Sequence, residues 1–418
     1  MTHQDPPEKT QLDVGFVPLT DCAPLAAALE KGFFEQEGLA VTLRRQRSWA
    51  GIRDNLAVGV YDAAQLLYPM PLAMSLGVGG PVTPTVTALC LGLNGNAITL
   101  SHDLADQMAR AADQEKMVDD PDALAPPRDA GPLRSVIRQR REAGQPPLTF
   151  GIVFPTSTHH YEMRYWLESA GIDPDADLRL IVLPPPDMPA ALRDGQIQGF
   201  CVGEPWNSFA VQRGWGRVMI TKHQLWNNGP EKVLGVTRDW ADRHPATHRA
   251  LLRAIVGAAR WCDDPGNRVE LASLIAGPRY VDLPEDVVAQ SLTGRLTFSQ
   301  TQPPQPAPDF HVFHRYAANF PWTSHARWFL EQMVRAGHLE PPTDPAAVAE
   351  AVSLTDVYRR VAADLDLPAP TDDEKSEGHH DQPWTLTRAT APIAMGPDRL
   401  FDGRIFEPRP PAGHGPEG

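Results

Sequence analysis

Three short stretches combine large aromatic side chains with ionisable groups, and two of them add glycine or proline turns. They are THHYEMRYW (residues 158–166), FCVGEPW (200–206) and GPEK (229–232). Small-molecule pockets have such linings, because a few polar groups among apolar walls fix the orientation of a ligand. We expect these stretches, with Trp49 and Asn96 from upstream, to close around a small oxyanion.

The composition predicts a globular protein with a sizeable core and an acidic surface. Of 418 residues, 42% are hydrophobic and 22% are charged, and the formal charge is −14 at pH 7. The length favours two or three domains, or two lobes of one binding fold. The negative charge argues against nucleic acid as a direct partner, because phosphate binding needs a basic surface. Any anion site must be a local positive spot.

We expect a cytoplasmic protein without a membrane segment. The first residues, MTHQDPPEKTQLDVGF, are polar and lack the basic and apolar parts of a secretory signal. No run approaches the ~20 apolar residues that a membrane helix requires. Four cysteines are far apart in the sequence and form no CxxC pair, which fits reduced thiols.

The elements that must position these residues form two successive β-α-β units. In the first unit, strands at 12–18, 39–44 and YDAAQLL alternate with the helices CAPLAAALEKGFF and SWAGIRDNLAVG. Thr20 or Asp21 is placed to cap the first of these helices. In the second unit, strands at 148–153 and 178–183 flank a helix at 158–171. This order predicts parallel α/β sheets with ligand-binding loops at the strand ends.

We therefore predict an α/β protein of two lobes with a cleft between them. Residues 12–98 form the first part of lobe I, 99–228 form lobe II, and 229–370 return to lobe I as a mostly helical part. Residues 103–145 are expected to be a surface helix–loop–helix that carries the insert DPDALAPPRDAGP. Residues 371–418, rich in Pro, Gly and charge, are expected to be an extended and partly disordered tail.

The motifs resemble the nitrate-binding branch of the ABC-type solute-binding proteins. The matching pieces are GFVPLTDCAPLAAALEKGFFEQEGLAV, SWAGIRDNLAVGVYDAAQLLYPMPLAMSLGVGG, LNGNAITLS, THHYEMRYWL, GFCVGEPWN and GPEKVLGVTRDW, within residues 12–263. The resemblance implies a type II periplasmic-binding-protein fold with mixed sheets, in which two lobes hinge around a buried anion, followed here by a helical C-terminal extension.

The resemblance also assigns the anion-site residues one by one. The site tryptophan falls on Trp49, the histidine on His159 and the lysine on Lys232, and the side-chain amide falls on Asn96, where the transporter pattern has Gln. The shorter side chain leaves open whether Asn96 bonds the anion directly, acts through a water, or changes the preference between nitrate and nitrite. The wall and backbone contacts fall on Val202, Gly203 and Pro205.

These residue types suit a flat, weakly basic anion such as nitrate. Lys232 supplies a positive charge and up to three donors, the indole of Trp49 only donates, and His159 donates through one or both ring nitrogens. His160 should point about 100° away from His159 on a helix, so only one of the two faces the cleft. A carboxylate would repel an anion, so we expect Glu204 to turn away and pair with a base such as Arg164.

Each assignment has an ordinary structural alternative. Without the resemblance, Lys232 reads as a solvated lysine, His159 as a surface or core histidine, and Trp49 as core packing. Trp166 and Trp206 are expected to be mainly structural.

We expect neither a cofactor nor a metal, and we expect that the protein is not an enzyme. Bicarbonate-binding relatives use a cation beside their anion, whereas Lys232 supplies the charge itself. The GxSxG, P-loop and HExxH motifs are absent from the sequence.

The resemblance, with the polar N-terminus, implies a cytoplasmic nitrate/nitrite sensor of the NasS type. Such sensors hold an RNA-binding antiterminator of the NasT type that controls nitrate assimilation, and release it when the anion binds. The alternative is the substrate-binding component of an ABC nitrate transporter.

Overall fold

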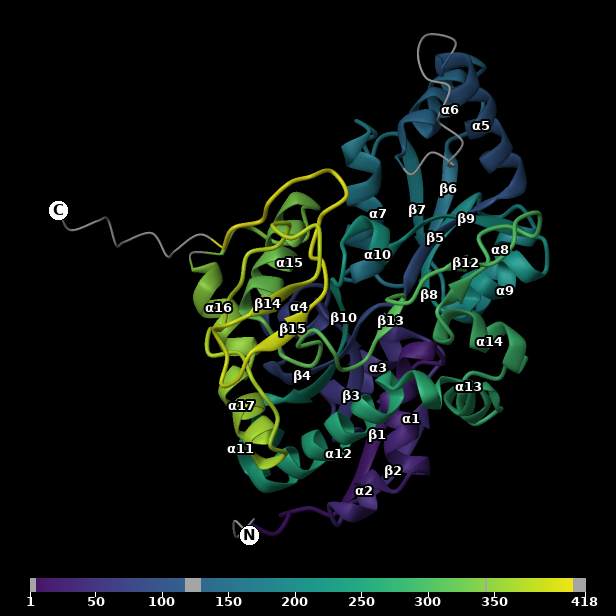
Figure 1. The fold of residues 1–418 in the computed structure, drawn as a ribbon. Coiled ribbons are helices and arrows are strands. Elements are labelled where there is room, and N and C mark those ends of the chain that lie inside the picture. Colours follow the sequence, from purple (N-terminus) through teal and green to yellow (C-terminus); the bar gives the residue numbers. More distant parts are fainter. Residues whose placement is uncertain (1–4, 117–128, 343, 409–418) are drawn as a thin grey trace, which may run out of the picture.

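The chain forms two α/β lobes that lie against each other (Figure 1), which confirms the expected fold class. The computed structural model describes residues 5–116, 129–342 and 344–408. The expected insert at 120–132 and the end of the tail lie largely outside the described residues.

In the described chain, the sheet of lobe I has six strands in the order β13-β4-β10-β3-β1-β2. β1 pairs in parallel with β2 and β3, whereas β10 runs antiparallel between β3 and β4. β3 and β4 are buried along their whole length, as in a sheet covered on both faces. The bounds are β1 Gln11–Phe16, β2 Ala40–Arg45, β3 Ala63–Leu67, β4 Thr85–Asn94, β10 Pro230–Thr237 and β13 His311–Val312.

The sheet of lobe II has five strands in the order β7-β6-β8-β5-β9 within the described ranges. β6 pairs in parallel with β7 and β8, and β5 runs antiparallel to β8 and β9. Both sheets are therefore mixed. The bounds are β5 Asn96–Ser101, β6 Leu148–Ile152, β7 Leu178–Val182, β8 Gly199–Gly203 and β9 Gly216–Thr221.

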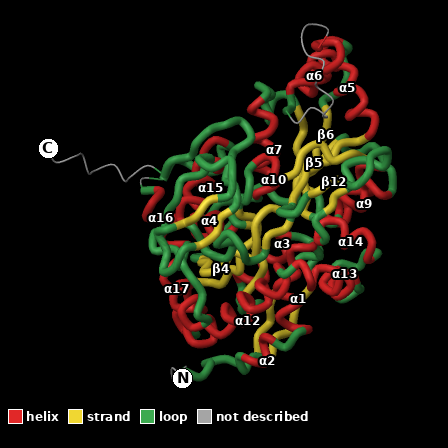
Figure 2. Tube along the Cα trace, viewed as in Figure 1, coloured by secondary structure: helices red, strands yellow, loops and turns green. Residues whose placement is uncertain are grey.

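Helices cover the sheets of both lobes (Figure 2). Those before and within lobe II are α1 Ala23–Glu30, α2 Phe33–Gln36, α3 Trp49–Ala57, α4 Met70–Leu76, α5 His102–Lys116, α6 Gly131–Glu142, α7 Thr158–Ser169, α8 Met188–Arg193, α9 Trp206–Gln212 and α10 Lys222–Leu225. Those after it are α11 Arg238–Arg243, α12 Pro245–Asp263, α13 Arg268–Ala276, α14 Glu285–Leu292, α15 Thr323–Arg335, α16 Pro345–Val352 and α17 Thr355–Asp364.

The chain crosses between the lobes at two points. The first crossing is the turn from β4 to β5, where Asn94 and Gly95 have positive φ angles of 63° and 92°. A Cβ on Gly95 would lie 2.6 Å from Cε1 of His311, so the turn requires glycine there. The second crossing leads from α10 in lobe II into β10 of lobe I. Because β5 and β10 join the sheets at these crossings, their ends lie at the boundary between the lobes.

One hydrophobic cluster extends across both lobes. It contains Leu19 and Trp49 from lobe I together with Phe200, Val202 and Trp206 from lobe II. Apolar surface is therefore already buried between the lobes, and this burial favours the closed arrangement.

The C-terminal segment differs from the expected disordered tail. Residues 371–408 have little regular structure apart from the hairpin β14 (Trp384–Leu386) and β15 (Ile393–Met395), but they pack closely over the molecule. Glu377 is fully buried, and Leu400 forms a β-bridge with Trp226. Low regular-structure content and many Pro and Gly residues do not exclude a fixed path when side chains are buried along it.

Part of the second lobe I segment also departs from the expected division. Leu296, Phe298 and Phe310 pack with Ala97 and Val211 of lobe II. Two short paired strands, β11 (Arg295–Leu296) and β12 (Gln305–Pro306), lie in this stretch. Residues 294–310 therefore contact lobe II rather than forming part of a helical lobe I.

No helix in the described ranges has the length and apolar character needed to cross a membrane.

Candidate functional site

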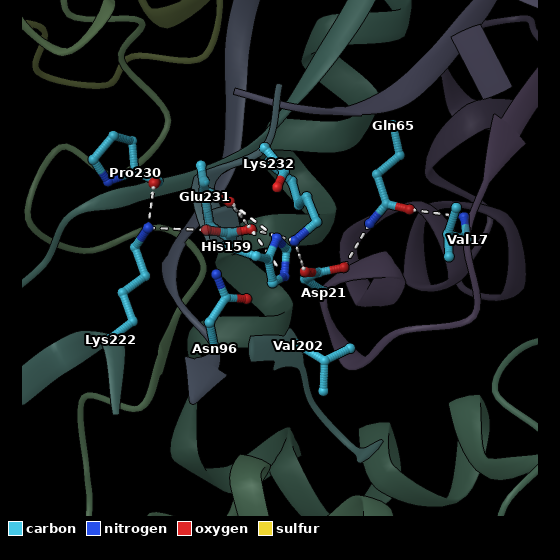
Figure 3. Close-up of polar contacts among 12 residues, drawn as sticks. Val17, Asp21, Gln65, Asn96, His159, Val202, Lys222, Pro230, Glu231 and Lys232 are labelled. Carbon is cyan, nitrogen blue, oxygen red and sulfur yellow. Dashed lines mark hydrogen bonds and ion pairs between the residues drawn. The ribbon is translucent and has the colours of Figure 1, made fainter. Parts of the chain in front are cut away.

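Lys232 is buried near the start of β10, at the boundary between the lobes (Figure 3). Its Nζ lies 2.8 Å from Oδ2 of Asp21 and 2.5 Å from Oε1 of Glu231. The same ammonium group lies 5.5 Å from the ring centroid of Trp49, within the range of a cation–π contact. These contacts use two of the three donors of the lysine.

A second buried lysine, Lys222 at the start of α10, was not foreseen. Its Nζ forms an ion pair with Glu162, and it lies 2.9 Å from Oε2 of Glu231 and 2.7 Å from the carbonyl oxygen of Pro230. Glu231 therefore bridges the lysines of both lobes. The sequence around Lys222 carries no signal of this role, whereas Glu231 stands beside Lys232 in GPEK.

Adjacent strand residues normally point to opposite faces, yet Glu231 and Lys232 both reach the cluster. The pairing of β10 with β4 is irregular between Pro230 and Val233. Such a bulge re-aims side chains locally and is common beside functional sites. This irregularity explains why alternation along GPEK does not reveal the partnership.

Lys222, Lys232 and Glu231 hold one another ionised. Burial alone would raise the pKa of Glu231, but Lys222 and Lys232 outweigh it and hold that pKa below its ordinary value. Burial alone would lower the pKa of Lys232, but Asp21 and Glu231 raise it above its ordinary value. Two ammonium groups face three carboxylates, so the cluster carries one net negative charge when all are ionised. Lys232 is thus not the free positive charge that the sequence predicted.

His159 and His160 diverge as the helix geometry predicts. Nε2 of His159 lies 3.7 Å from Oε1 of Glu231, whereas Nδ1 of His160 lies 2.7 Å from the carbonyl oxygen of Pro155. Burial lowers the pKa of His159 to about 3, so its ring is neutral near pH 7. The hydroxyl of Thr158 donates to Oε1 of Glu231 at 2.6 Å, so toward Nδ1 of His159, 3.3 Å away, it can only accept. That contact places the ring proton on Nδ1, whereas the other tautomer gives up the contact and donates from Nε2.

Five buried polar atoms in and around this cluster have no hydrogen-bond partner among the described residues. They are Oγ1 of Thr20, Oδ2 of Asp21, Nε1 of Trp49, Oδ1 of Asn96 and Nε2 of His159, and Oδ2 of Asp21 is held by the ion pair with Lys232. Buried polar atoms are normally satisfied, and an unmet group costs about 1–3 kcal/mol. A hydrogen-bonding guest at this place would remove several such costs at once.

The lobe II wall of the site comes from β5 and the end of β8. Asn96 opposes Gly203 across the pairing of these strands, and Ala97 opposes Val202. A Cβ on Gly203 would lie 3.4 Å from Oδ1 of Asn96, so glycine leaves this amide oxygen room. Asn96 and Val202 lie beside His159 in Figure 3. Pro205 follows at the start of α9.

The lobes are closed around these side chains. The backbone N–H of Thr20 donates to the carbonyl oxygen of Glu204 at 2.8 Å, and Nε1 of Trp206 donates to the carbonyl oxygen of Pro18 at 3.2 Å. Trp206 therefore joins the lobes as well as packing in the core. Because the site residues are buried, an anion must enter while the lobes are apart.

Two expectations about acidic residues are wrong. Neither Thr20 nor Asp21 caps the first helix: Asp21 instead accepts from Gln65 at 2.6 Å, and Gln65 is held in turn by the N–H of Val17. Both residues are buried at the site, so the cap pattern concealed site residues.

Glu204 does not pair with Arg164. One of its carboxylate oxygens accepts from the N–H of Ser208 at 3.1 Å, and the other is buried without a partner. Arg164 binds Asp175 instead. Burial raises the pKa of Glu204 to about 7.

The described residues contain no group of three or more His, Cys, Asp or Glu side chains arranged to hold a metal ion. The carboxylates of the cluster are instead engaged by Lys222 and Lys232.

Comparison with known proteins gives matches along nearly the whole chain. The profile of the NMT1-like family matches residues 5–276. The nitrate import ATP-binding protein NrtC of Synechocystis is 36% identical over 411 residues, and the bicarbonate transport ATP-binding protein CmpC of Synechococcus elongatus is 37% identical over 362 residues. These matches cover 97% and 86% of this chain but only 55% and 50% of those proteins, so the chain spans about half of their length.

Two further matches cover most of both chains. The nitrate/nitrite binding protein NrtA of Synechococcus elongatus is 32% identical over 419 residues, which are 97% of this chain and 86% of that protein. The crystal structure of the periplasmic nitrate-binding protein NrtA from Synechocystis superposes with a TM-score of 0.83 at 30% identity, covering 96% of this chain and 97% of that one. The fold is therefore that of a periplasmic-binding protein.

Proposed function

Because the chain belongs to the NMT1-like family and is homologous to nitrate-binding solute-binding proteins, we propose that it binds nitrate or nitrite between its lobes. We further propose that it acts as a cytoplasmic sensor that releases an RNA-binding antiterminator of the NasT type when the anion binds.

The observation that carries the binding proposal is the set of unmet donors beside a buried cation. Trp49 and Thr20 offer an indole N–H and a hydroxyl, and Lys232 has one donor left over. His159 adds an imidazole N–H in the tautomer that donates from Nε2. Nitrate and nitrite only accept hydrogen bonds, so a site made of donors suits them. Charge-assisted bonds contribute roughly 1.5–3 kcal/mol each, and micromolar affinity needs about 8 kcal/mol in total. A few such bonds are sufficient.

Closure of the lobes provides the link from binding to signalling. The donors come from lobe I (Thr20, Trp49, Lys232) and lobe II (His159), so only the closed arrangement presents all of them to one anion. The anion therefore stabilises closure by its differential affinity for the two arrangements. Coupling of this kind typically changes partner affinity by about 1–3 kcal/mol.

The sensor role rests on the resemblance of the site motifs to the nitrate-binding branch of the solute-binding proteins. NrtC, a protein named for ATP binding in nitrate import, matches this chain over 55% of its own length. The homology to NrtA favours a second candidate, the substrate-binding component of an ABC nitrate transporter.

Replacement of Trp49 by Phe tests the binding proposal. Trp49→Phe keeps the ring near Lys232 but removes the indole N–H, so we expect calorimetry to show nitrate affinity about tenfold weaker, as for the loss of one hydrogen bond. Trp384→Phe is the matched control, because Trp384 on β14 also has a buried indole N–H without a partner and should leave affinity unchanged. Equal affinity in wild type and Trp49→Phe would remove Trp49 from the site.

Complex formation tests the sensor proposal. The purified protein should co-elute with a NasT-type antiterminator in size-exclusion chromatography, and nitrate should separate the two. Persistence of the complex in saturating nitrate, or its absence without nitrate, contradicts the sensor role. Nitrate-dependent stimulation of a transporter ATPase by this protein would support the transport candidate, and fractionation of cells would establish the compartment.

A further inference from the structure

The amide of Asn96 is oriented by Glu162 rather than by the anion site. Nδ2 of Asn96 donates to Oε2 of Glu162 at 3.3 Å, and this leaves the buried Oδ1 without a partner. An ionised carboxylate only accepts, so while Glu162 is ionised the amide must turn its NH₂ toward it. The amide oxygen is then the atom left for the site, and it repels an acceptor-only anion.

Glu162 lies in a closed environment formed by several elements. Lys222 from α10 forms an ion pair with it, Glu231 from β10 lies across Lys222, and the buried thiol of Cys201 from β8 lies near it. His159 belongs to the same helix but contacts Glu231 instead. Lys222 keeps Glu231 and the carbonyl oxygen of Pro230 as partners if Glu162 loses its charge. Neutralisation of Glu162 therefore leaves no buried cation unpaired.

We propose that Glu162 gates anion affinity: when its carboxylate takes up a proton, the amide of Asn96 reverses and donates from Nδ2 to the bound nitrate or nitrite. This inference rests on the proposed function, and Glu162 acts in it as a positioning residue.

The proton and the hydrogen bonds balance in this step. One proton passes from solvent water to Oε2 of Glu162, and the new O–H donates to Oδ1 of Asn96. The NH₂ group then faces the site, where it supplies a donor in place of an acceptor. The cluster changes from one net negative charge to neutral before the anion arrives, so repulsion of the anion falls as well.

The pKa values of the neighbouring groups favour Glu162 as the carrier of this proton. Burial raises the pKa of Glu162 to about 7, and Glu231 adds to the rise while Lys222 opposes it. Burial lowers the pKa of His159 to about 3, so His159 takes a proton far less readily. Burial also raises the pKa of Asp21 and of Glu204, but neither carboxylate has a described contact with Asn96.

Nitrate affinity should fall as pH rises, because the protein binds nitrate in the form in which Glu162 is protonated. Nitrate affinity should be fully expressed below the pKa of Glu162 in the free protein and should fall by about tenfold for each pH unit above it, with one proton bound per anion.

Calorimetric titration with nitrate at pH 6, 7 and 8 tests the inference, with each pH measured in two buffers of different ionisation enthalpy. The wild type should take up close to one proton per nitrate at pH 8 and less at pH 6, with affinity about tenfold weaker at pH 8 than at pH 6. Glu162→Gln should bind with no proton uptake and with a pH-independent affinity close to that of the wild type at pH 6.

Two further variants separate this role from general damage to the site. Glu204→Gln removes another buried carboxyl of raised pKa and should keep the proton uptake of the wild type. Asn96→Leu, which has no amide, should bind nitrate more weakly than the wild type at pH 6 and with a smaller pH dependence, because only the charge effect of Glu162 remains. This variant tests the inference if Glu162→Gln fails to fold.

Nitrate binding by the wild type without proton uptake, or uptake that persists in Glu162→Gln, overturns this inference but not the proposed function. No binding of nitrate or nitrite by the folded wild type at any pH overturns both.

Discussion

At the scale of single residues, the site depends on a lysine whose charge is shared. Lys232 is held by Asp21 and Glu231 before any ligand is present, and it is buried with them. A lysine in this arrangement supports the fold as well as the ligand, since breaking one side of a buried ion pair costs about 3–5 kcal/mol. Loss of binding in a Lys232 variant is therefore informative only if stability is measured with it.

A pair of variants separates these two roles. Lys232→Met should lower the free energy of unfolding by about 3–5 kcal/mol, because Asp21 loses its ion-pair partner and Glu231 keeps only Lys222. Adding Asp21→Asn should restore part of that stability in urea unfolding but not the binding of nitrate in calorimetry. Recovery of nitrate affinity in the double variant would show that Lys232 does not hold the anion.

At the scale of elements, two helices carry a site residue in the first turn, and a serine caps each of them. The side chain of Ser48 accepts from Gly51 at the start of α3, which begins at Trp49. Ser157 accepts from the N–H of His160 at 3.0 Å at the start of α7, and its hydroxyl donates to the carbonyl oxygen of Phe154. The caps fix where Trp49 and His159 enter the site.

Ser157→Ala should therefore affect both stability and binding. We expect a loss of about 0.5–2 kcal/mol in the free energy of unfolding, together with weaker nitrate binding, because the first turn of α7 carries His159. Asp344→Ala is the control: Asp344 caps α16, which contributes none of the proposed site residues. A similar loss of stability with unchanged affinity is expected there. Equal effects of both variants on nitrate affinity would contradict a positioning role for the cap.

The sequence predicts the elements better than it predicts the contacts between them. The two β-α-β units and the two-lobed class follow from hydrophobic periodicity and turn residues, which are local signals. The partners of Lys232 do not follow from local signals. Asp21 lies 211 positions away from Lys232 in the chain, and Glu231 contacts Lys232 only because the strand is irregular there. The ion pair of Lys222 with Glu162 cannot be predicted from the sequence for the same reason, since ion pairing across elements leaves no periodic pattern.

At the scale of the whole molecule, the segment 371–408 ties the lobes together along one side. Glu377 accepts from Nε1 of Trp226 at the second crossing and contacts His325 of α15 and Lys375. Further along, Asp402 accepts from the hydroxyl of Tyr165 on α7 of lobe II. The segment thus contacts α15, the crossing and lobe II in turn, and it should resist opening of the lobes.

The buried carboxylate of this segment gives a pH-dependent contribution to stability. Burial alone would raise the pKa of Glu377, but Lys375 and His325 lower that pKa from its ordinary 4.5 to about 2. A lowered pKa stabilises the fold at pH values above 4.5, and the contribution, roughly 3 kcal/mol, is lost as pH falls toward 2. Urea unfolding of wild type and Glu377→Gln should differ most near pH 7, and the difference should shrink as pH falls from 4.5 toward 2. A difference that is constant with pH would contradict this contribution.

The central claim, that the lobes close on nitrate or nitrite through Lys232 and its neighbours, is tested most directly by calorimetric titration. The purified protein should be titrated with nitrate, with nitrite, and with bicarbonate in the presence and absence of calcium. We predict micromolar binding of nitrate or nitrite without any divalent cation, corresponding to about 8 kcal/mol. No measurable binding of nitrate or nitrite, with bicarbonate bound only when calcium is present, would contradict the account, because Lys232 would then not be the charge that holds the ligand.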